Sequence, residues 1–492
     1  MDENRALVSA TIKGTAWNYL VFGLSKGVTF VTTVILARLL SPDEFGLMAI
    51  GLLVIGYLDT FGGLGMENVV IYRQDNTEYN ANVAFTIGII FDVIISAVTF
   101  LCAPWVAAFF KEPRVTDILR VLSLVFIIWG MGDIHAARLK KEMQFRQTLL
   151  PEFGKAAAKA VVSIGMAFAG FGVWSLVWGQ VAANIAASTL YWIVYRWRPR
   201  LTLDFKTSRQ LVSYSSQTVL SEFMGAIQGN IDYLIVGKRL GPDNLGFYTM
   251  AFRVPELLII NTCYIVSNAL FPAYARLQND LDALRKGFLL TLRYIAIYTV
   301  PVGVGLFLIT PEIVDVLFGQ KWAPAIPVMQ AISLYAVIYS LSFNAGDIYK
   351  AIGRPDLMNI LGLFKLGVVI PLLWVAGGYN IYYVGLAQVA AHSILTVVRF
   401  LVIRSVIKLR WREIFSALQP AVTSTLAMFV CTYAFHLWLK NLPSLLSLIL
   451  LPLVGGVVYA AALWLTNREV ALKGLEILRR TFIKKSKVET SS

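Results

Sequence analysis

Residues 34–46 read VILARLLSPDEFG, and residues 234–246 read LIVGKRLGPDNLG. The two stretches align without a gap at an offset of 200 residues. They share five identities: Ile35/Ile235, Leu40/Leu240, Pro42/Pro242, Asp43/Asp243 and Gly46/Gly246. Each is an apolar run that ends in a proline-containing turn. Self-similarity at a fixed period indicates a repeat architecture, so the chain is interpreted as two related halves.

Three shorter matches follow in the same order, and all four lie at offsets between 200 and 214. They are Ser123-Leu124 with Ser333-Leu334, Gly132-Asp133-Ile134 with Gly346-Asp347-Ile348, and Gln180-Val181-Ala182-Ala183 with Gln388-Val389-Ala390-Ala391. One such match could arise by chance in an apolar chain, but four in order predict a true repeat. Transporters built from repeats place their substrate sites at the repeat interface, so the pattern favours transport.

The composition indicates a membrane protein, with 57% hydrophobic and 15% charged residues. A soluble protein has about 25% charged residues. A membrane helix needs roughly 20 apolar residues, and the polar start MDENRALVSA predicts no cleaved signal peptide. Fourteen spans are predicted, near 15–38, 45–66, 81–103, 116–134, 149–170, 173–195, 212–236, 247–270, 288–310, 326–349, 355–377, 382–404, 418–438 and 445–466.

These spans predict an all-α integral membrane protein with two parallel six-helix lobes. The lobes cover residues 1–200 and 201–410, and residues 411–492 form two extra helices and a basic cytoplasmic tail. With both ends inside, cytoplasmic segments carry 28 Lys and Arg and outer loops carry seven. This bias predicts cytoplasmic termini. It also explains the net charge of +14 without nucleic acid, and makes anionic lipid headgroups the expected surface partner.

Several charged residues fall inside the predicted spans, where an ionisable group costs at least about 2.5–3.5 kcal/mol. The basic candidates are Lys26, Lys159, Arg253, Lys365 and Arg293, and the acidic candidates are Asp59, Asp92 and Glu222. The functional interpretation is a wet, net-cationic cavity for an anionic headgroup such as a diphosphate, with the acids as coupling groups. The alternative interpretation is structural pairing between neighbouring helices.

Other charges favour simpler roles. Lys155, Arg120 and Arg399 can extend toward an interface, although Lys155 shares a helix face with Lys159. Asp43 and Asp243 are expected to cap the helices that follow them.

No motif predicts catalysis, a metal or a cofactor. The sequence contains no G-x-x-x-x-G-K-[ST] loop, no H-E-x-x-H run and no Cys/His cluster with zinc spacing. Any uphill transport therefore has to draw on an ion gradient, the membrane potential or consumption of substrate on the far side.

The stretch ILARLLSPDEFGLMAIG (35–51) resembles the first hairpin of polysaccharide transporters in the multidrug/oligosaccharidyl-lipid/polysaccharide flippase superfamily. The likeness is to the Wzx-type group of teichuronic- and colanic-acid exporters. Further similar stretches are GFGVWSLVWGQ (170–180), RWRPRL (196–201), NIDYLIVGKRLG (230–241), FPAYARLQND (271–280), LFGQKWAPA (317–325) and AIGRPDL (351–357).

The resemblance covers roughly 400 residues and implies a multi-pass protein of the bacterial inner membrane. It implies that the protein flips an undecaprenyl-diphosphate-linked oligosaccharide to the outer leaflet by rocking two six-helix lobes. A polysaccharide polymerase and chain-length machinery are the implied partners, and we expect a monomer. No candidate cation lies in a motif that aligns with a known site residue.

Four alternatives are weighed. A cation-coupled multidrug exporter of the same superfamily needs poised carboxylates, and Lys26 in a first span without a carboxylate argues against it. A major-facilitator transporter lacks support in the loop ENVVIYRQDNTEYN (67–80). An oligosaccharide polymerase or ligase would carry a long outer loop, whereas the outer loops here are short. A purely structural scaffold would not need charges at mid-membrane.

Overall fold

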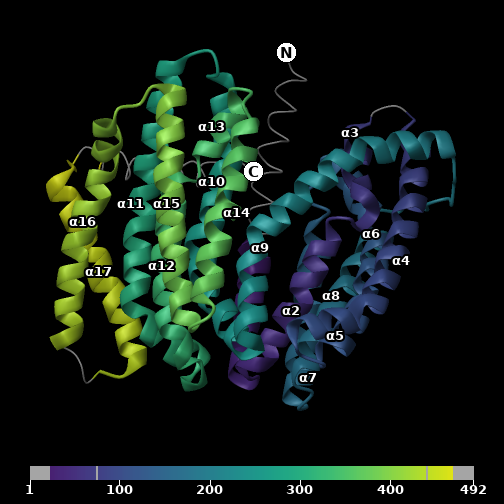
Figure 1. Ribbon diagram of the computed structural model, residues 1–492, viewed down its shortest axis with the longest axis horizontal. Coiled ribbons are helices and arrows are strands. Elements are labelled where there is room, and N and C mark those ends of the chain that lie inside the picture. Colours follow the sequence, from purple (N-terminus) through teal and green to yellow (C-terminus); the bar gives the residue numbers. More distant parts are fainter. Residues whose placement is uncertain (1–22, 74–75, 439–441, 469–471, 473–492) are drawn as a thin grey trace, which may run out of the picture. The chain divides into compact units, whose positions relative to one another are not determined.

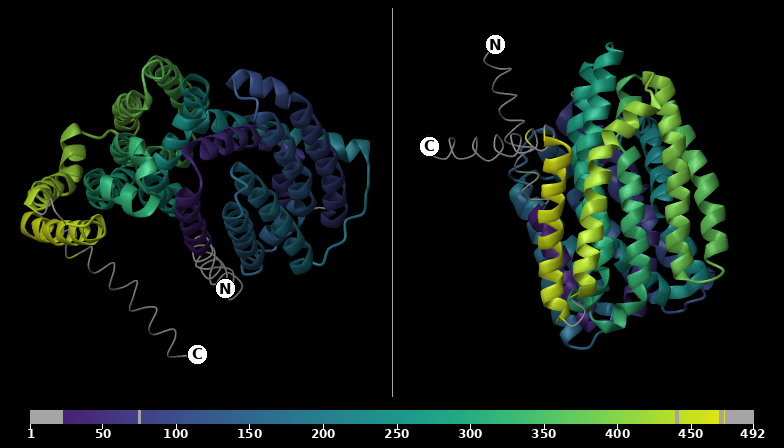
Figure 2. Two further views of the ribbon diagram at one scale, coloured as in Figure 1. Left: turned by 90° about the horizontal axis from the view of Figure 1, so that it is seen from below. Right: turned by 90° about the vertical axis from the view of Figure 1, so that its left-hand side faces the viewer.

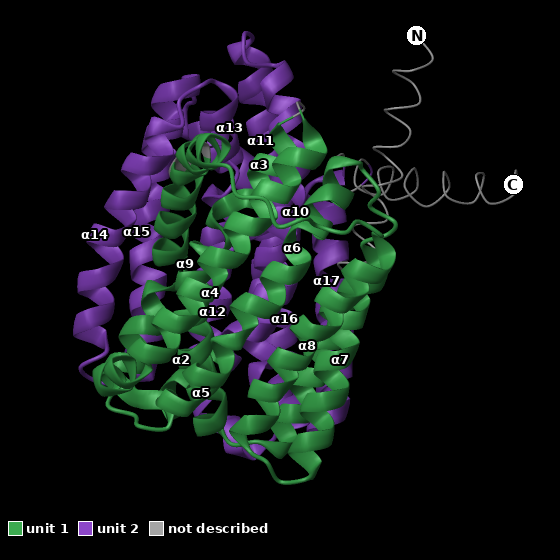
Figure 3. Cartoon of the chain, turned by 90° about the vertical axis from the view of Figure 1, so that its right-hand side faces the viewer, with its two compact units in different colours: residues 1–249 green, residues 250–492 purple. Residues whose placement is uncertain are grey.

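The computed structural model describes residues 23–73, 76–438, 442–468 and 472. These residues form helices joined by short turns, and no β-strand occurs among them. The chain divides into two compact units, Met1–Thr249 and Met250–Ser492 (Figure 3). The lobe boundaries at residues 200 and 410 stay predictions.

Unit 1 consists of long helices with two shorter ones between them (Figure 1). A helix over 23–39 opens the described chain. It is followed by α2 (Pro42–Asp59), α3 (Met66–Tyr72), α4 (Thr77–Phe110), α5 (Val115–Leu122), α6 (Leu124–Lys141), α7 (Leu149–Phe168), α8 (Val173–Val194) and most of α9 (Phe205–Pro255).

Unit 2 begins within α9 and continues through eight further α-helices. These are α10 (Asn261–Arg276), α11 (Leu281–Ile313), α12 (Ile326–Ser342), α13 (Ala345–Ala351), α14 (Asp356–Ala376), α15 (Ile381–Ile407), α16 (Trp411–Trp438) and α17 (Ser444–Thr466). The last two pack side by side and both lie against α11, at the edge of this unit (Figure 2).

Ten helical segments in the described residues are long and apolar enough to cross a membrane. One of them, Thr218–Arg276, covers the predicted span 247–270 and most of the predicted span 212–236. The helices α7 and α8 are not among the ten, and α7 carries Glu152, Lys155 and Lys159. The predicted first span lies partly outside the described residues. A polytopic helical membrane protein is thus confirmed, and the count of fourteen stays a prediction.

The start of α2 shows how the repeated turn is built. Ser41 is the N-cap: its hydroxyl accepts from the Glu44 backbone N–H, while the Glu44 carboxylate accepts from the Ser41 N–H at 2.7 Å. Pro42 occupies the first turn, where its missing N–H costs nothing. The prediction that Asp43 caps this helix is wrong. Its carboxylate instead accepts two hydrogen bonds from Arg114, at 2.6 and 2.9 Å.

The two repeated turns contact each other within unit 1. A Cβ atom on Gly46 would lie 1.8 Å from the carbonyl oxygen of Pro242. A Cβ atom on Gly246 would lie 1.9 Å from the carbonyl oxygen of Pro42. The contact is therefore reciprocal, and only glycine allows the backbones to approach this closely.

The segment between α8 and α9 is fixed to unit 1. The buried ring of His135 lies with its Nε2 3.0 Å from the carbonyl oxygen of Trp197. Two further backbone N–H groups donate to side chains of α4, from Arg200 to Asn82 at 2.8 Å and from Thr202 to Thr86 at 2.9 Å. The connection between the predicted lobes therefore runs in a defined register along unit 1.

Candidate functional site

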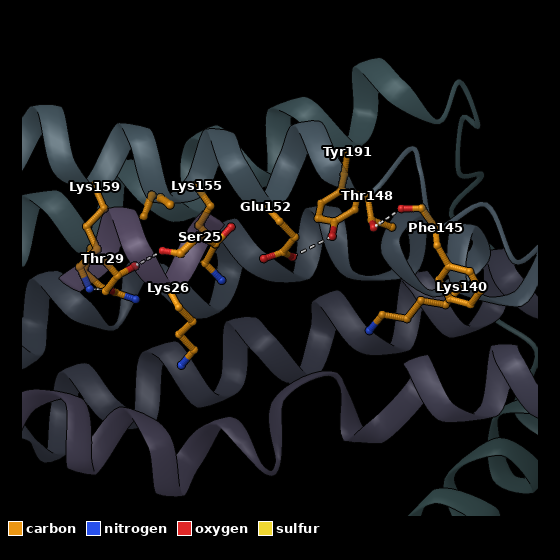
Figure 4. Close-up of a pocket in the computed structure, with 13 residues that line it drawn as sticks. Ser25, Lys26, Thr29, Lys140, Phe145, Thr148, Glu152, Lys155, Lys159 and Tyr191 are labelled. Atoms are coloured by element: carbon orange, nitrogen blue, oxygen red, sulfur yellow. Dashed lines mark hydrogen bonds between the residues drawn. The ribbon is translucent and has the colours of Figure 1, made fainter. Parts of the chain in front are cut away.

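Unit 1 contains a pocket of about 640 Å³ (Figure 4). Its walls come from the helix over 23–39, from α6, from the turn before α7, and from α7 and α8. Four lysines line it, Lys26, Lys140, Lys155 and Lys159. Glu152 is the one acidic residue among the described lining residues. The pocket is therefore net positive.

The lysines are held by different kinds of contact. Lys159 donates a hydrogen bond of 2.8 Å to the amide oxygen of Gln180. Lys140, in the last turn of α6, forms an ion pair with Glu67 of α3. Lys155 places its ammonium nitrogen 4.7 Å from the centre of the Trp129 ring, where the π-electrons attract a cation.

Glu152, the acidic residue in the pocket, is also held by a hydrogen bond. The Tyr191 hydroxyl of α8 donates to the Glu152 carboxylate of α7 at 3.0 Å, as the dashed line in Figure 4 marks. Tyr191 is 2% exposed, so its hydroxyl needs a protein partner.

The helix period explains why α7 supplies three of the charged groups. Residues three and four apart share a helix face, so Glu152, Lys155 and Lys159 form one row along α7. At ~1.5 Å per residue, this row runs about 10 Å into the unit. The neighbouring α8 lies close enough to reach it because Gly179 has no side chain: a Cβ there would lie 1.8 Å from the Ser163 hydroxyl oxygen.

The structure brings together two of the five predicted cations. Lys26 and Lys159 line the pocket of unit 1. Arg253, Arg293 and Lys365 belong to unit 2 and do not line this pocket. Their predicted role stays a prediction.

Two of the predicted acids lie beside an irregular turn over Gly62–Gly65. The Gly63 backbone N–H donates to Asp92 at 2.8 Å. A Cβ on Gly62 would lie 3.5 Å from an Asp59 oxygen and 3.6 Å from an Asp92 oxygen, so both carboxylates face this glycine. Glu222 is exposed and accepts from Asn68 at 3.4 Å.

A third acid joins this place, although the sequence did not single it out. An oxygen of Asp133 would lie 3.5 Å from a Cβ on Gly63. Asp133 sits at the end of a predicted span, which hid its approach to the turn. In the part of the chain that the structure describes, no group of three or more His, Cys, Asp or Glu side chains could hold a metal ion.

Three residues that line the pocket are not among the site residues that the sequence predicts. The sequence predicts that Lys155 extends toward an interface, yet it lines the pocket with Lys159. Its four-residue spacing from Lys159 was the signal. Glu152 has the same kind of signal, because it precedes Lys155 by three residues. Lys140 lies in the basic last turn of α6, and nothing in the sequence separates it from its basic neighbours there.

Unit 2 contains an apolar groove of about 410 Å³. It is lined by Leu258 and by residues of α11, α16 and α17, among them Pro301, Met428, Leu451 and Gly456. No charged residue occurs among its described lining residues.

Known proteins resemble the chain along most of its length. It is 23% identical over 445 residues to "Lipopolysaccharide biosynthesis protein WzxC" of Escherichia coli (strain K12), covering 89% of each chain. It is 24% identical over 486 residues to "Succinoglycan biosynthesis transport protein ExoT" of Rhizobium meliloti (strain 1021), covering 95% of each chain.

Solved structures share the fold. "Lipid II flippase MurJ, inward closed conformation" matches with a TM-score of 0.75 and 13% identity, over 92% of this chain and 99% of that one. An inward-facing multidrug resistance MATE family transporter of the MOP superfamily matches with a TM-score of 0.66 and 15% identity, over 79% and 94%.

The family described as "Polysaccharide biosynthesis protein" matches residues 35–327, which is more than half of the chain. This confirms the resemblance read from the repeated turn and the stretches after it. The protein belongs to this polysaccharide biosynthesis family.

Proposed function

We propose that this protein flips a lipid-diphosphate-linked oligosaccharide of the undecaprenyl type across the bacterial inner membrane for surface polysaccharide assembly. The observation that carries the proposal is the lysine-lined pocket of unit 1. A succinoglycan biosynthesis transport protein is among its relatives, and a lipid II flippase is among its structural neighbours.

The pocket suits a diphosphate headgroup. Lysine binds phosphate as a point charge, and hydrogen bonds between ammonium and phosphate groups are about twice as strong as neutral ones. The volume of about 640 Å³ falls in the range of about 300–1,000 Å³ that small-molecule sites occupy. It has room for a headgroup, not for a whole lipid.

The groove of unit 2 suits an apolar chain. A lipid tail needs apolar walls and leaves no room for unpaired charge, and the lining from α11, α16 and α17 meets that condition. The two cavities therefore match the two chemistries of an amphiphilic substrate.

Transport follows by alternating access between two six-helix lobes within fourteen spans, a scheme that the sequence repeat supports. Arg253, Arg293 and Lys365 add positive charge to the part of the chain that forms unit 2. The carboxylates Asp59 and Asp92 are the coupling groups, because Asp92 is bonded to the irregular turn and a change in its protonation would alter that bond. Glu222 joins them as a weaker candidate.

The protein acts as a transporter and not as an enzyme. Both termini lie in the cytoplasm, and the basic segments there contact anionic lipids. A monomer suffices for the proposed cycle, and a polysaccharide polymerase with its chain-length machinery takes the product.

The test uses purified protein in vesicles with a fluorescent lipid-diphosphate oligosaccharide. The double variant Lys155→Ala/Lys159→Ala should slow leaflet crossing by at least about tenfold, since two charged hydrogen bonds are worth about 1.5–3 kcal/mol each. Lys206→Ala, at an exposed lysine of α9 outside the pocket, is the matched control and should leave the rate unchanged. Equal rates for the double variant and wild type would overturn the proposal.

A cation-coupled multidrug exporter is the second candidate, because the MATE transporter shares the fold. Four lysines against one glutamate in the pocket would repel a cationic drug. Competition decides between the two: inorganic diphosphate should block lipid flipping, and cationic dyes should neither compete nor accumulate in the vesicles.

A further inference from the structure

Two α7 side chains in the pocket, Glu152 and Lys155, have the spacing of an ion pair but do not form one. Residues three apart on a helix are neighbours, and an acid and a base at this spacing attract each other. The same chain forms such pairs elsewhere, Asp117 with Arg120 at 3.7 Å and Asp282 with Arg285 at 3.4 Å.

Each partner is instead held by an aromatic residue of another helix. Tyr191 of α8 donates to Glu152 at 3.0 Å, and Trp129 of α6 carries the Lys155 ammonium 4.7 Å from its ring centre. The two aromatic rings also contact each other edge to face, with centroids 6.2 Å apart. Among the described residues, no carboxylate lies within ion-pair distance of Lys155.

We infer that Tyr191 and Trp129 are positioning residues that keep the acidic residue of the pocket away from Lys155. The ammonium group is then stabilised by a π-face, which attracts it without neutralising its charge. An anionic ligand can approach Lys155 without first displacing a carboxylate. This inference rests on the proposed function, because it assumes a phosphate-bearing headgroup in the pocket.

The Tyr191 hydroxyl is suited to this role because it is buried and donates its hydrogen bond to Glu152. The side chain is 2% exposed, and a buried hydroxyl without a partner is costly. The carboxylate therefore stays with the tyrosine for as long as α7 and α8 stay packed. Removal of the single oxygen in Tyr191→Phe keeps the ring and its contact with Trp129, and releases Glu152 toward Lys155.

The experiment measures binding of inorganic diphosphate to the full chain in detergent by calorimetry. Tyr191→Phe should weaken binding roughly three- to fivefold, the upper range for a partly exposed ion pair. Glu152→Gln should bind more tightly than wild type, because it removes a negative charge. The double variant Tyr191→Phe/Glu152→Gln should bind as tightly as Glu152→Gln alone, since residue 152 then has no charge to draw it to Lys155, and Glu152→Gln should therefore tighten binding more in Tyr191→Phe than in wild type.

The matched control is Tyr195→Phe, one turn further along, whose hydroxyl donates to Glu142 outside the pocket. It should bind diphosphate as wild type does. If Tyr191 only supported the packing of α8, Glu152→Gln would tighten binding by the same factor in Tyr191→Phe as in wild type, and that result would overturn the inference. Wild-type affinity in Tyr191→Phe would overturn it as well.

Failure of the proposed function gives a different result. If Lys155→Ala/Lys159→Ala binds diphosphate as tightly as wild type, the pocket is not the headgroup site, and both the proposed function and the inference are lost. If that variant loses binding while Tyr191→Phe does not, only the positioning role is wrong.

Discussion

The pocket of unit 1 and the groove of unit 2 differ in charge more than in size. The first, about 640 Å³, is lined by four lysines, and the second, about 410 Å³, has no charged residue in its described lining. Both are built from packed helices of one chain whose sequence repeats. The pocket is lined by helices of the first predicted repeat, whereas two of the helices that line the groove, α16 and α17, lie in residues 411–492, outside both repeats. The difference teaches that the apolar cavity depends on helices that follow the repeat and is not the repeat copy of the charged one.

The repeated turns show the opposite behaviour, because they stay alike. Gly46 and Gly246 each approach the backbone of the other turn's proline, at Pro242 and Pro42. A contact this close tolerates no side chain on either glycine, which explains why the same residue occurs in both copies. The most sensitive test of the repeat is therefore at these turns.

The largest effect is expected for Gly46→Ala and Gly246→Ala. The added methyl would lie under 2 Å from a carbonyl oxygen, so the turns must separate. Overpacking of this kind costs about 1–3 kcal/mol, occasionally more, and we expect lowered thermal stability and loss of flipping in both variants. Thermal unfolding in detergent and the vesicle assay measure this.

A matched control lies on the same helix. Gly56 of α2 has no atom within 4 Å of an added Cβ, so Gly56→Ala should be harmless. If Gly46→Ala behaves like Gly56→Ala, the contact between the turns does not matter. If only one of Gly46→Ala and Gly246→Ala is affected, the contact is not reciprocal in function.

The next effect concerns the difference between the two cavities. Gly456 lies near the middle of α17 in the apolar groove, with open space where a side chain would begin. Gly456→Lys should slow lipid flipping by at least about tenfold, because a charge in an apolar membrane site costs about 2.5–3.5 kcal/mol. Binding of inorganic diphosphate, which needs no apolar wall, should be unchanged.

Gly456→Ala is the control, because a methyl group leaves the groove apolar. The pocket variant Lys155→Ala/Lys159→Ala should show the reverse pattern in binding, with diphosphate affinity lost. If Gly456→Lys also abolished diphosphate binding, the two cavities would not have separate roles, and the comparison between them would fail.

Part of this organisation could be predicted from the sequence. The apolar runs located the helices, and the spacing of Lys155 and Lys159 placed both on one face of α7. The spacing did not say which face α8 covers, because that depends on the close packing of Gly179 against Ser163. The bond between Tyr191 and Glu152 joins residues 39 apart, and no local pattern predicts it.

The prediction that Asp43 caps α2 is wrong for a different reason. The run from Ser41 to Glu44 has the S-x-x-E pattern of a capping box, so Ser41 could have been recognised as the cap from the sequence. Asp is common at helix N-caps, but the Asp43 carboxylate can bind Arg114 because Ser41 already caps the helix. The capping box is a local pattern that the sequence predicts, whereas no local pattern predicts that Asp43 binds Arg114, 71 residues away.

The smallest effect is expected at Arg114, where the two repeated turns differ. Arg114 clamps Asp43 and also bonds to Glu112, whereas the exposed Asp243 forms no ion pair among the described residues. The Arg114 side chain is 54% exposed, and pairs of this kind contribute about 0–1 kcal/mol. Arg114→Ala should therefore lower the unfolding temperature only slightly at neutral pH.

The hydrogen bond from Arg114 lowers the pKa of Glu112. A carboxylate whose pKa is lowered by folding contributes stability above its unfolded pKa of about 4.3, and this contribution is lost as the pH falls through the lowered value. The difference between wild type and Arg114→Ala should shrink in acid, whereas a difference that grows as the pH falls would show that these carboxylates do not hold the turn.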